Sequence, residues 1–277
     1  MYLEEIIDVA RFIQIEKTDA AELMIYNQRS EVKLFRMNEP SPGIFISESS
    51  KVIRRALEAG YEPISVLTSI ESPDDDTKWI YDNCGDIPVY YCRDEIFRSI
   101  SGYALTGGIL SAMKRKPLPS PEEILNGKRI IAVLENIENP TNVGAIFRSA
   151  AAMGIEAILI TSDSSDPLYR RSERVSMGTV FQISWTKVDK SSDYLRLLSR
   201  NGFSTVAMAL RDDAVSINAP EIKQQNKLAI ILGNEGYGLS SDTINRSDIV
   251  AMIPMNPKVD SLNVAAASAV MFWELMK

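Results

Sequence analysis

The sequence predicts an α/β protein whose C-terminal half is built on a mostly parallel β-sheet. Short apolar runs of strand length recur in that half, at 130–134, 157–161, 203–210 and 228–232, with helical patterns between them. The first run, Ile-Ile-Ala-Val-Leu, is apolar at every position, which is typical of a strand buried on both faces. Strands that alternate with helices imply parallel pairing.

Further elements of this half follow from apolar spacing and from helix-ending glycines. A helix over 140–153 is closed by Gly154, and a helix over 192–200 ends before Gly202. The remaining expected elements are strands at 180–188 and 249–253, and a helix from about 262 to the end.

The N-terminal half also alternates, and it predicts a smaller α/β unit. Expected strands lie at 44–46, 63–67, 87–92 and 108–112, and expected helices lie at 50–59 and 76–83. Residues 3–14 carry apolar positions at helical spacing, which predicts a helical extension before this unit.

A proline-rich stretch marks the boundary between the halves. Pro117, Pro119 and Pro121 fall within five residues, and each proline fixes φ and restricts the residue before it. The predicted organisation has four parts: a helical extension 1–38, an α/β domain 39–113, a linker 114–127 and the larger domain 128–277.

Composition excludes several kinds of chemistry. The chain has no histidine, which removes Ser-His-Asp and Cys-His catalysis and histidine metal sites. Its two cysteines form no CxxC pair, so no metal is expected. No apolar run reaches the roughly 18 residues needed to span a membrane, and the first residues do not resemble a signal peptide, so we expect a cytoplasmic protein without a membrane partner.

Net charge argues weakly against a nucleic-acid partner. The chain carries −7, although local basic clusters decide binding more than the total does. Two such clusters are present, Lys114-Arg115-Lys116 and the group of Arg170, Arg171 and Arg174.

Three polar clusters begin where predicted strands end. The first, 135–148, contains Asn142 near a helix start and Arg148 six residues later. By itself it is equally compatible with an ordinary loop that has an asparagine cap and a surface arginine.

The second cluster, Gly233-Asn-Glu-Gly-Tyr-Gly-Leu239, holds Glu235 among three glycines. Glycines permit unusual backbone angles and the close approach of a ligand, although a tight turn is the simpler alternative. The loop matches neither the Walker A pattern nor GxGxxG.

The third cluster runs from Ile253 to Val264 and includes Ser261, Leu262 and Asn263 before an alanine-rich helix. Its alternative is a capped helix with Ser261 as the cap. Ligands of parallel sheets bind beyond the carboxyl ends of the strands, so the three clusters are expected to meet there.

In order and spacing, these clusters resemble the motifs of the SpoU, or TrmH-like, branch of the SPOUT RNA methyltransferases. The matching stretches are N-x-G-A-I-x-R, L-G-N-E-G-x-G-L and I-P-M followed by S-L-N-V-A-x-A, with R-V-S-M-G at 174–178 between the first two. The N-terminal unit resembles, more loosely, the L30e-like RNA-binding domain that often precedes the catalytic domain. Residues 1–38 lie outside the resemblance.

The resemblance implies a fold, a cofactor and a reaction. It implies an α/β-knot domain with a deep trefoil knot, S-adenosylmethionine as methyl donor, and transfer to a ribose 2′-hydroxyl of RNA, with rRNA favoured over tRNA. It also implies a homodimer with the knot helix in the interface. Phe272 and Trp273 near the end of that helix are compatible with this, and core packing is the simpler alternative for them. The residues expected by position to bind the cofactor are Met208, Ala209, Leu232, Gly233, Gly236, Gly238, Ile253, Met255, Ser261 and Leu262.

The catalytic residues carried over from the family are Arg148, Asn142, Glu235, Ser261 and Asn263. A guanidinium stays protonated, so we expect Arg148 to fix the target phosphate and stabilise the developing alkoxide instead of acting as a base. Asn142, Ser261 and Asn263 would position the ribose and Arg148, and Glu235 would orient these groups.

Two alternatives remain at this stage. One is an RNA-binding protein of the same fold without catalysis, which the intact polar motif residues disfavour. The other is a nucleotide-dependent oxidoreductase, which would require a glycine fingerprint after the first strand, whereas 135–142 contains no glycine.

Overall fold

A computed structural model describes residues 11–27, 31–37, 43–69, 73–101, 108–189, 192–256, 258 and 261–277. The chain divides into two compact units. Unit 1 comprises residues 1–117 and 168–181, and unit 2 comprises residues 118–167 and 182–277. The segment 168–181 therefore clusters with the N-terminal half, although its sequence position lies within the predicted C-terminal domain.

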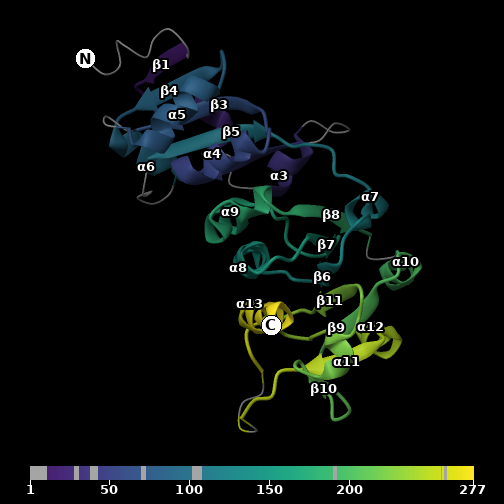
Figure 1. Ribbon diagram of the computed structural model, residues 1–277. Coiled ribbons are helices and arrows are strands. Elements are labelled where there is room, and N and C mark those ends of the chain that lie inside the picture. The colour runs from purple at the N-terminus through teal and green to yellow at the C-terminus, as the bar shows by residue number, and fades with distance from the viewer. Residues whose placement is uncertain are drawn as a thin grey trace. The chain divides into compact units, whose positions relative to one another are not determined.

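Unit 1 contains a five-stranded sheet in the order β1-β4-β3-β5-β2 (Figure 1). Strand β5 is antiparallel to both of its neighbours, and the other pairs are parallel. The strands are β1 (Arg11–Ile15), β2 (Ile44–Glu48), β3 (Pro63–Thr68), β4 (Pro88–Cys92) and β5 (Ile109–Lys114). The described helices of this unit are η1 (Ala21–Leu23), α2 (Met24–Asn27), α3 (Glu31–Arg36), α4 (Ser50–Glu58), α5 (Asp75–Asn83), α6 (Asp94–Ser101), α9 (Arg170–Ser176) and η2 (Thr179–Phe181).

The prediction of a helix over 3–14 is wrong where the structure describes the chain. Residues 11–15 form strand β1, which pairs in parallel with β4 from Arg11 opposite Pro88 to Ile15 opposite Cys92. A short apolar run such as Phe-Ile-Gln-Ile fits both periods, and pairing with β4 satisfies its backbone groups. Residues 1–10 lie outside the described residues. The part of the predicted extension after β1 does contain the short helices α2 and α3.

Helix α9, which the sequence analysis did not predict, is held to β2 and α4 by polar contacts. Ser47 on β2 donates a hydrogen bond to buried Glu173 at 2.6 Å, and Glu48 forms ion pairs with Arg174 at 3.2 Å and Arg170 at 3.5 Å. Two arginines of the predicted basic cluster are thus engaged by a carboxylate of the protein itself. After α9, Arg55 donates to the carbonyl oxygen of Met177.

Unit 2 contains a seven-stranded sheet in the order β10-β12-β9-β11-β6-β7-β8, parallel throughout. Its strands are β6 (Ile130–Leu134), β7 (Ala157–Thr161), β8 (Ser184–Val188), β9 (Ser204–Met208), β10 (Val215–Ser216), β11 (Leu228–Leu232) and β12 (Ile249–Met252). Its described helices are α7 (Pro121–Leu125), α8 (Pro140–Ala152), α10 (Tyr194–Arg200), α11 (Pro220–Lys223), α12 (Ser241–Arg246) and α13 (Val264–Met276).

Helices cover both faces of this sheet (Figure 1). Leu125 of α7 and Leu198 of α10 pack with Val133 and Ile231 of the central strands, and Ile244 of α12 joins the same cluster. On the other side, α8 and α13 pack against each other. The central strands β6 and β11 are therefore buried on both faces, as their apolar sequences predict.

Local signals in the sequence explain where several helices and strands begin, and the structure corrects two of the expected starts. Helix α8 begins with proline after Asn139, whose side chain caps the helix by accepting from the Thr141 N–H at 2.9 Å. Helix α13 is capped by Asn263 and not by Ser261. The strand expected over 180–188 starts only at Ser184, because 179–181 form a short 3-10 helix. Within the described ranges, no helix combines the length and the apolar character that a membrane span requires.

Candidate functional site

One cavity of about 370 Å³ lies at the carboxyl ends of β9, β11 and β12 in unit 2. Three loops form its wall: the residues after β9, the glycine-rich loop 233–239 after β11, and the segment after β12 that leads to α13. Its size falls within the range usual for small-molecule sites.

All ten residues expected to bind the cofactor line this cavity. They come from four places in the chain that only the fold brings together. The lining includes Met208, Ala209, Leu232, Gly233, Gly236, Gly238, Ile253, Met255, Ser261 and Leu262.

The loop 233–239 is shaped by its own hydrogen bonds. Asn234 and Gly238 exchange backbone hydrogen bonds of 3.2 and 2.9 Å. The Asn234 side-chain oxygen accepts from the N–H groups of Gly236 at 2.8 Å and Tyr237 at 3.1 Å. At Gly233, a Cβ atom would lie only 2.5 Å from the Leu239 backbone nitrogen, so only glycine fits.

The cavity suits a ligand that combines polar edges with apolar surfaces. Its glycine-rich wall lets the main chain border the cavity directly, and Leu210, Ile253 and Leu262 add apolar surface. S-adenosylmethionine, which carries an adenine, a ribose and an amino-acid tail, needs both kinds of contact. Among the described residues, no cluster of Cys, Asp and Glu is arranged to hold a metal ion.

Three of the five predicted catalytic side chains form a hydrogen-bonded chain beside the cavity. Asn142, in the first turn of α8, donates through its side-chain nitrogen to the carboxylate of Glu235. Asn263, at the start of α13, donates to the side-chain oxygen of Asn142 at 3.1 Å. Asn142 is buried, and both polar atoms of its side-chain amide are hydrogen-bonded. This polar chain joins one residue from each of the three motifs.

The other two predicted catalytic residues lie apart from this chain. Ser261 is exposed and lines the cavity. Arg148 is exposed on α8, about 120° around the helix axis from Asn142, and makes no hydrogen bond or ion pair with any residue that the structure describes. Within one chain, therefore, the structure does not join Arg148 to the Asn142–Glu235 pair.

Two residues that shape the site were missed in the sequence. Asn234 folds the glycine-rich loop, and its side chain also donates to the Asn136 carbonyl oxygen at 2.9 Å. Glu135, the residue directly after β6, contacts the end of the same loop region by accepting from the Ser240 N–H at 3.0 Å. Both lie inside the polar clusters that begin where predicted strands end, so their position at strand ends was the available signal.

The fold and the cavity define a class: a parallel α/β domain that binds a small molecule at the carboxyl ends of its strands, with a polar chain beside it. Residues 129–273 match the SpoU rRNA Methylase family. The chain belongs to this family, and is therefore an RNA methyltransferase that uses S-adenosylmethionine as methyl donor.

Two relatives illustrate the similarity in sequence. The chain is 31% identical over 234 residues to the uncharacterized tRNA/rRNA methyltransferase Mb0905 of Mycobacterium bovis, covering 83% of this chain and 80% of that protein. It is 28% identical to the 23S rRNA (guanosine(2553)-2′-O)-methyltransferase RlmP of Bacillus subtilis, covering 64% of this chain and 73% of that protein.

A solved structure extends the similarity of fold to nearly the whole chain. The AdoMet-bound rRNA methyltransferase of Sinorhizobium meliloti superposes with a TM-score of 0.79 at 20% identity. The superposition covers 95% of this chain and 97% of that one. The shared architecture thus includes both units.

Proposed function

We propose that this protein methylates the 2′-hydroxyl of a ribose in structured RNA, with ribosomal RNA as the favoured substrate. The observation that carries the proposal is the hydrogen-bonded chain from Asn263 through Asn142 to Glu235, because Glu235 also lines the cavity. This arrangement holds polar side chains next to a cofactor-sized space. RlmP, which is named for 2′-O-methylation of a guanosine in 23S rRNA, supports the choice of substrate, and such a substrate would place the protein in the cytoplasm.

The bound cofactor supplies a methyl group on a positively charged sulfur. The ten cavity residues would hold it, mainly through the backbone of the loop 233–239. In-line attack requires the ribose hydroxyl to be aligned with that methyl group, and alignment alone can supply much of the acceleration. We assign this positioning to Asn142, Ser261 and Asn263, with Glu235 orienting the Asn142 amide.

Arg148 is assigned to the RNA phosphate and to the alkoxide that develops during transfer. Its exposure and its lack of a partner among the described residues support a role that begins only when substrate arrives. A protonated guanidinium offers five donors in a planar fork that matches a phosphate.

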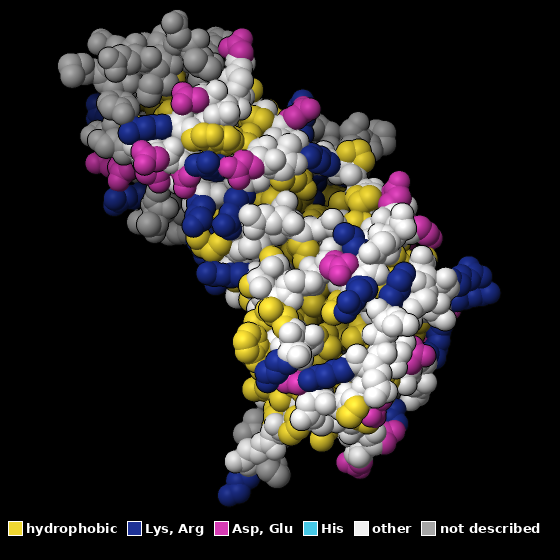
Figure 2. Space-filling model, in the orientation of Figure 1, with side chains coloured by type: hydrophobic (Ala, Val, Ile, Leu, Met, Phe, Trp, Pro, Cys, Tyr) yellow, Lys and Arg dark blue, Asp and Glu magenta, His cyan; other side chains and the backbone are white. Residues whose placement is uncertain are grey.

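We also propose that two copies associate through α13. Val270, Trp273 and Met276 are 40, 53 and 56% exposed and recur every third residue, so they form one apolar stripe on this helix. Hydrophobic side chains are visible in the region of α13 in the space-filling view (Figure 2). Since α13 packs on α8, a second copy at this stripe would also approach the helix that carries Arg148.

The finer features of the fold are likewise proposed. For a trefoil knot in unit 2, the support is topological. Strands β12 and β6 are separated in the sheet by β9 and β11. Helix α13 follows β12, yet it packs on α8, which follows β6. The described residues on both sides of this connection, Ile253 and Met255 after β12 and Ser261 and Leu262 before α13, line the cavity at the carboxyl ends of β9 and β11. For an L30e-like unit 1, the support is its βαβ order and five-stranded mixed sheet.

The test uses ribosomal RNA from a strain that lacks this protein, incubated with purified protein and methyl-labelled S-adenosylmethionine. We expect label at one ribose with the wild-type chain, and loss of label with Arg148→Ala, which retains cofactor binding by calorimetry. Arg200→Ala, an exposed arginine on α10, is the matched control and should methylate normally.

The outcomes separate the competing functions. No label in rRNA or tRNA, together with no stabilisation by S-adenosylmethionine, would favour an RNA-binding protein without catalysis. Full activity in Arg148→Ala would overturn the assignment of that residue and leave the reaction itself standing.

A further inference from the structure

Glu135 is the first residue after β6, beside the strand that leads into the glycine-rich loop. In the sheet, Leu134 of β6 lies opposite Leu232 of β11. The Glu135 N–H donates to the Leu232 carbonyl oxygen at 2.9 Å, immediately before Gly233 begins the loop. The main chain of Glu135 therefore holds the start of the loop.

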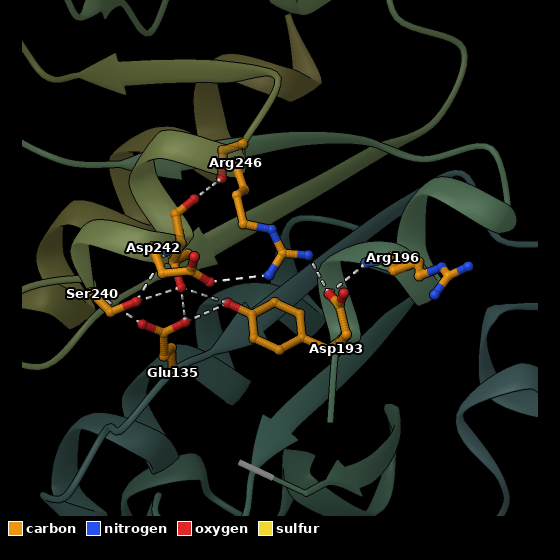
Figure 3. Close-up of polar contacts among 9 residues, drawn as sticks. Glu135, Asp193, Arg196, Ser240, Asp242 and Arg246 are labelled. Carbon is orange, nitrogen blue, oxygen red and sulfur yellow. Dashed lines mark hydrogen bonds and ion pairs between the residues drawn. The ribbon is translucent and has the colours of Figure 1, made fainter. Parts of the chain in front are cut away.

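The side chain of Glu135 holds the other end of the same loop (Figure 3). One carboxylate oxygen accepts from the Ser240 N–H at 3.0 Å. The other accepts from the Thr243 hydroxyl at 2.6 Å and from the Tyr194 hydroxyl. Ser240 caps α12 by accepting from the Thr243 N–H at 3.0 Å. The Glu135 carboxylate is therefore hydrogen-bonded to the first turn of α12, the helix that follows the loop.

The donors around the carboxylate are held in their donating form. Thr243 is 4% exposed and Tyr194 is 8% exposed. Burial, together with the adjacent carboxylate, raises the pKa of Tyr194, so its hydroxyl stays protonated. An anionic acceptor with three donors, including two buried hydroxyls, makes stronger hydrogen bonds than a neutral one.

Glu135 itself does not line the cofactor cavity. It faces a second cavity of about 310 Å³ on the other side of the loop, and the two cavities share Tyr237, Gly238 and Leu239 as a common wall. Any effect of Glu135 on the cofactor must therefore pass through the position of the loop.

We propose that Glu135 is a positioning residue that fixes both ends of the loop 233–239 and thereby sets the affinity for S-adenosylmethionine. The inference rests on the proposed function, because it assumes that this loop holds the cofactor. Inside the loop, the Asn234 side chain organises the backbone, and the two ends of the loop need an anchor of their own. The Glu135 side chain anchors the far end of the loop, and the Glu135 main chain anchors the near end.

The test compares Glu135→Gln with Glu156→Gln in the full-length protein. Glu156 makes the same kind of contact at the opposite end of the sheet, where its carboxylate accepts from the Arg129 N–H at 2.9 Å just before β6. The amide of Glu135→Gln keeps one acceptor but loses the charge and one acceptor site. We expect the Kd for S-adenosylmethionine, measured by calorimetry, to rise about tenfold in Glu135→Gln and to stay unchanged in Glu156→Gln.

A purely structural role predicts a different pattern. The inference requires the KM for S-adenosylmethionine to rise while the KM for RNA stays near the wild-type value, with a melting temperature of the ligand-free protein close to that of Glu156→Gln. An unchanged cofactor Kd, or an equal loss of affinity for cofactor and RNA with a lower melting temperature, would overturn it.

Two further arms keep the result interpretable. If Glu135→Gln does not fold, the test uses Thr243→Val, which removes one of the three donors to the carboxylate. We expect the Kd of this variant for S-adenosylmethionine to rise about threefold, and an unchanged Kd would overturn the inference. Wild-type protein that does not bind S-adenosylmethionine would refute the proposed function, whereas wild-type binding with unaffected variants would refute this inference alone.

Discussion

Gly233 offers a sharp test of how closely the glycine-rich loop is packed. In Gly233→Ala, the new Cβ would lie 2.5 Å from the Leu239 backbone nitrogen and 2.6 Å from the Gly238 carbonyl carbon. Non-bonded heavy atoms prefer separations of about 3.5–4.0 Å, so the loop backbone must move by roughly 1 Å. The obstruction is backbone, which cannot rotate away as a side chain can.

The expected cost follows from this overlap. Overpacking of this kind costs about 1–3 kcal/mol, which is roughly 5- to 150-fold in an equilibrium constant when it falls on the ligand-binding conformation. We expect the Kd of Gly233→Ala for S-adenosylmethionine to rise within that range, measured by isothermal titration calorimetry. A thermal-shift titration should show a correspondingly smaller stabilisation at a fixed cofactor concentration.

A matched control lies three residues along the same loop. In Gly236→Ala, the nearest atom to the new Cβ is the Asn234 side-chain oxygen at 3.4 Å, an ordinary contact. Gly236 also lines the cavity, so both variants add a methyl group to the same wall and differ in the backbone overlap. We therefore expect Gly236→Ala to lose clearly less affinity for the cofactor than Gly233→Ala. Equal affinities for the two alanine variants would refute the argument that close backbone packing shapes the cavity.

Three other predictions concern different parts of the chain. Asn142→Ala breaks the polar chain that joins the motifs, so kcat should fall about 10²-fold with little change in cofactor Kd; a single-turnover assay checks this, and an unaffected kcat contradicts it. Burial raises the pKa of Cys84 and of Cys92 to about 11, so a thiol reagent at pH 8 should react with them only after denaturation, and rapid labelling of native protein would contradict their burial. The hydrogen bond from Arg246 lowers the pKa of Asp193 in the folded protein. The contribution of this pair to stability is therefore present above the unfolded pKa of about 3.9, and it is lost as the pH falls through the lower folded pKa. The difference in Tm between wild type and Arg246→Ala should shrink below about pH 4, and a difference that grows in acid would contradict this pairing.

The position of the candidate cavity could be predicted from the sequence because strand ends in a parallel sheet converge. The strand prediction at 228–232 agrees with β11, and the loop that follows it lies in the cavity wall. The Asn142–Glu235 contact follows from the same geometry, since α8 follows β6 and the loop follows the adjacent strand β11.

Other features depend on tertiary contacts that leave little trace in local sequence. The residues of β1 have an apolar spacing that fits a helix as well as a strand, and only the partner strand β4 decides between them. The basic cluster around Arg170 suggested a surface for nucleic acid, but Arg170 and Arg174 form ion pairs with Glu48, which lies more than a hundred residues away in the chain. The separation of Arg148 from Asn142 follows from helix phase, because the two residues lie six positions apart on α8.

The attachment of α9 to unit 1 has a consequence for how such proteins can exchange parts. The segment 168–181 is encoded inside the C-terminal half, yet its buried Glu173 is held by Ser47 and its arginines by Glu48. A recombination event that replaced the N-terminal half alone would remove Ser47 and Glu48, which contact a buried carboxylate and two arginines of this segment, and removing one partner of a buried charged contact is costly. Unit 1 can therefore be exchanged without this cost only if the segment 168–181 is exchanged with it, so the part of the gene that encodes this unit is discontinuous.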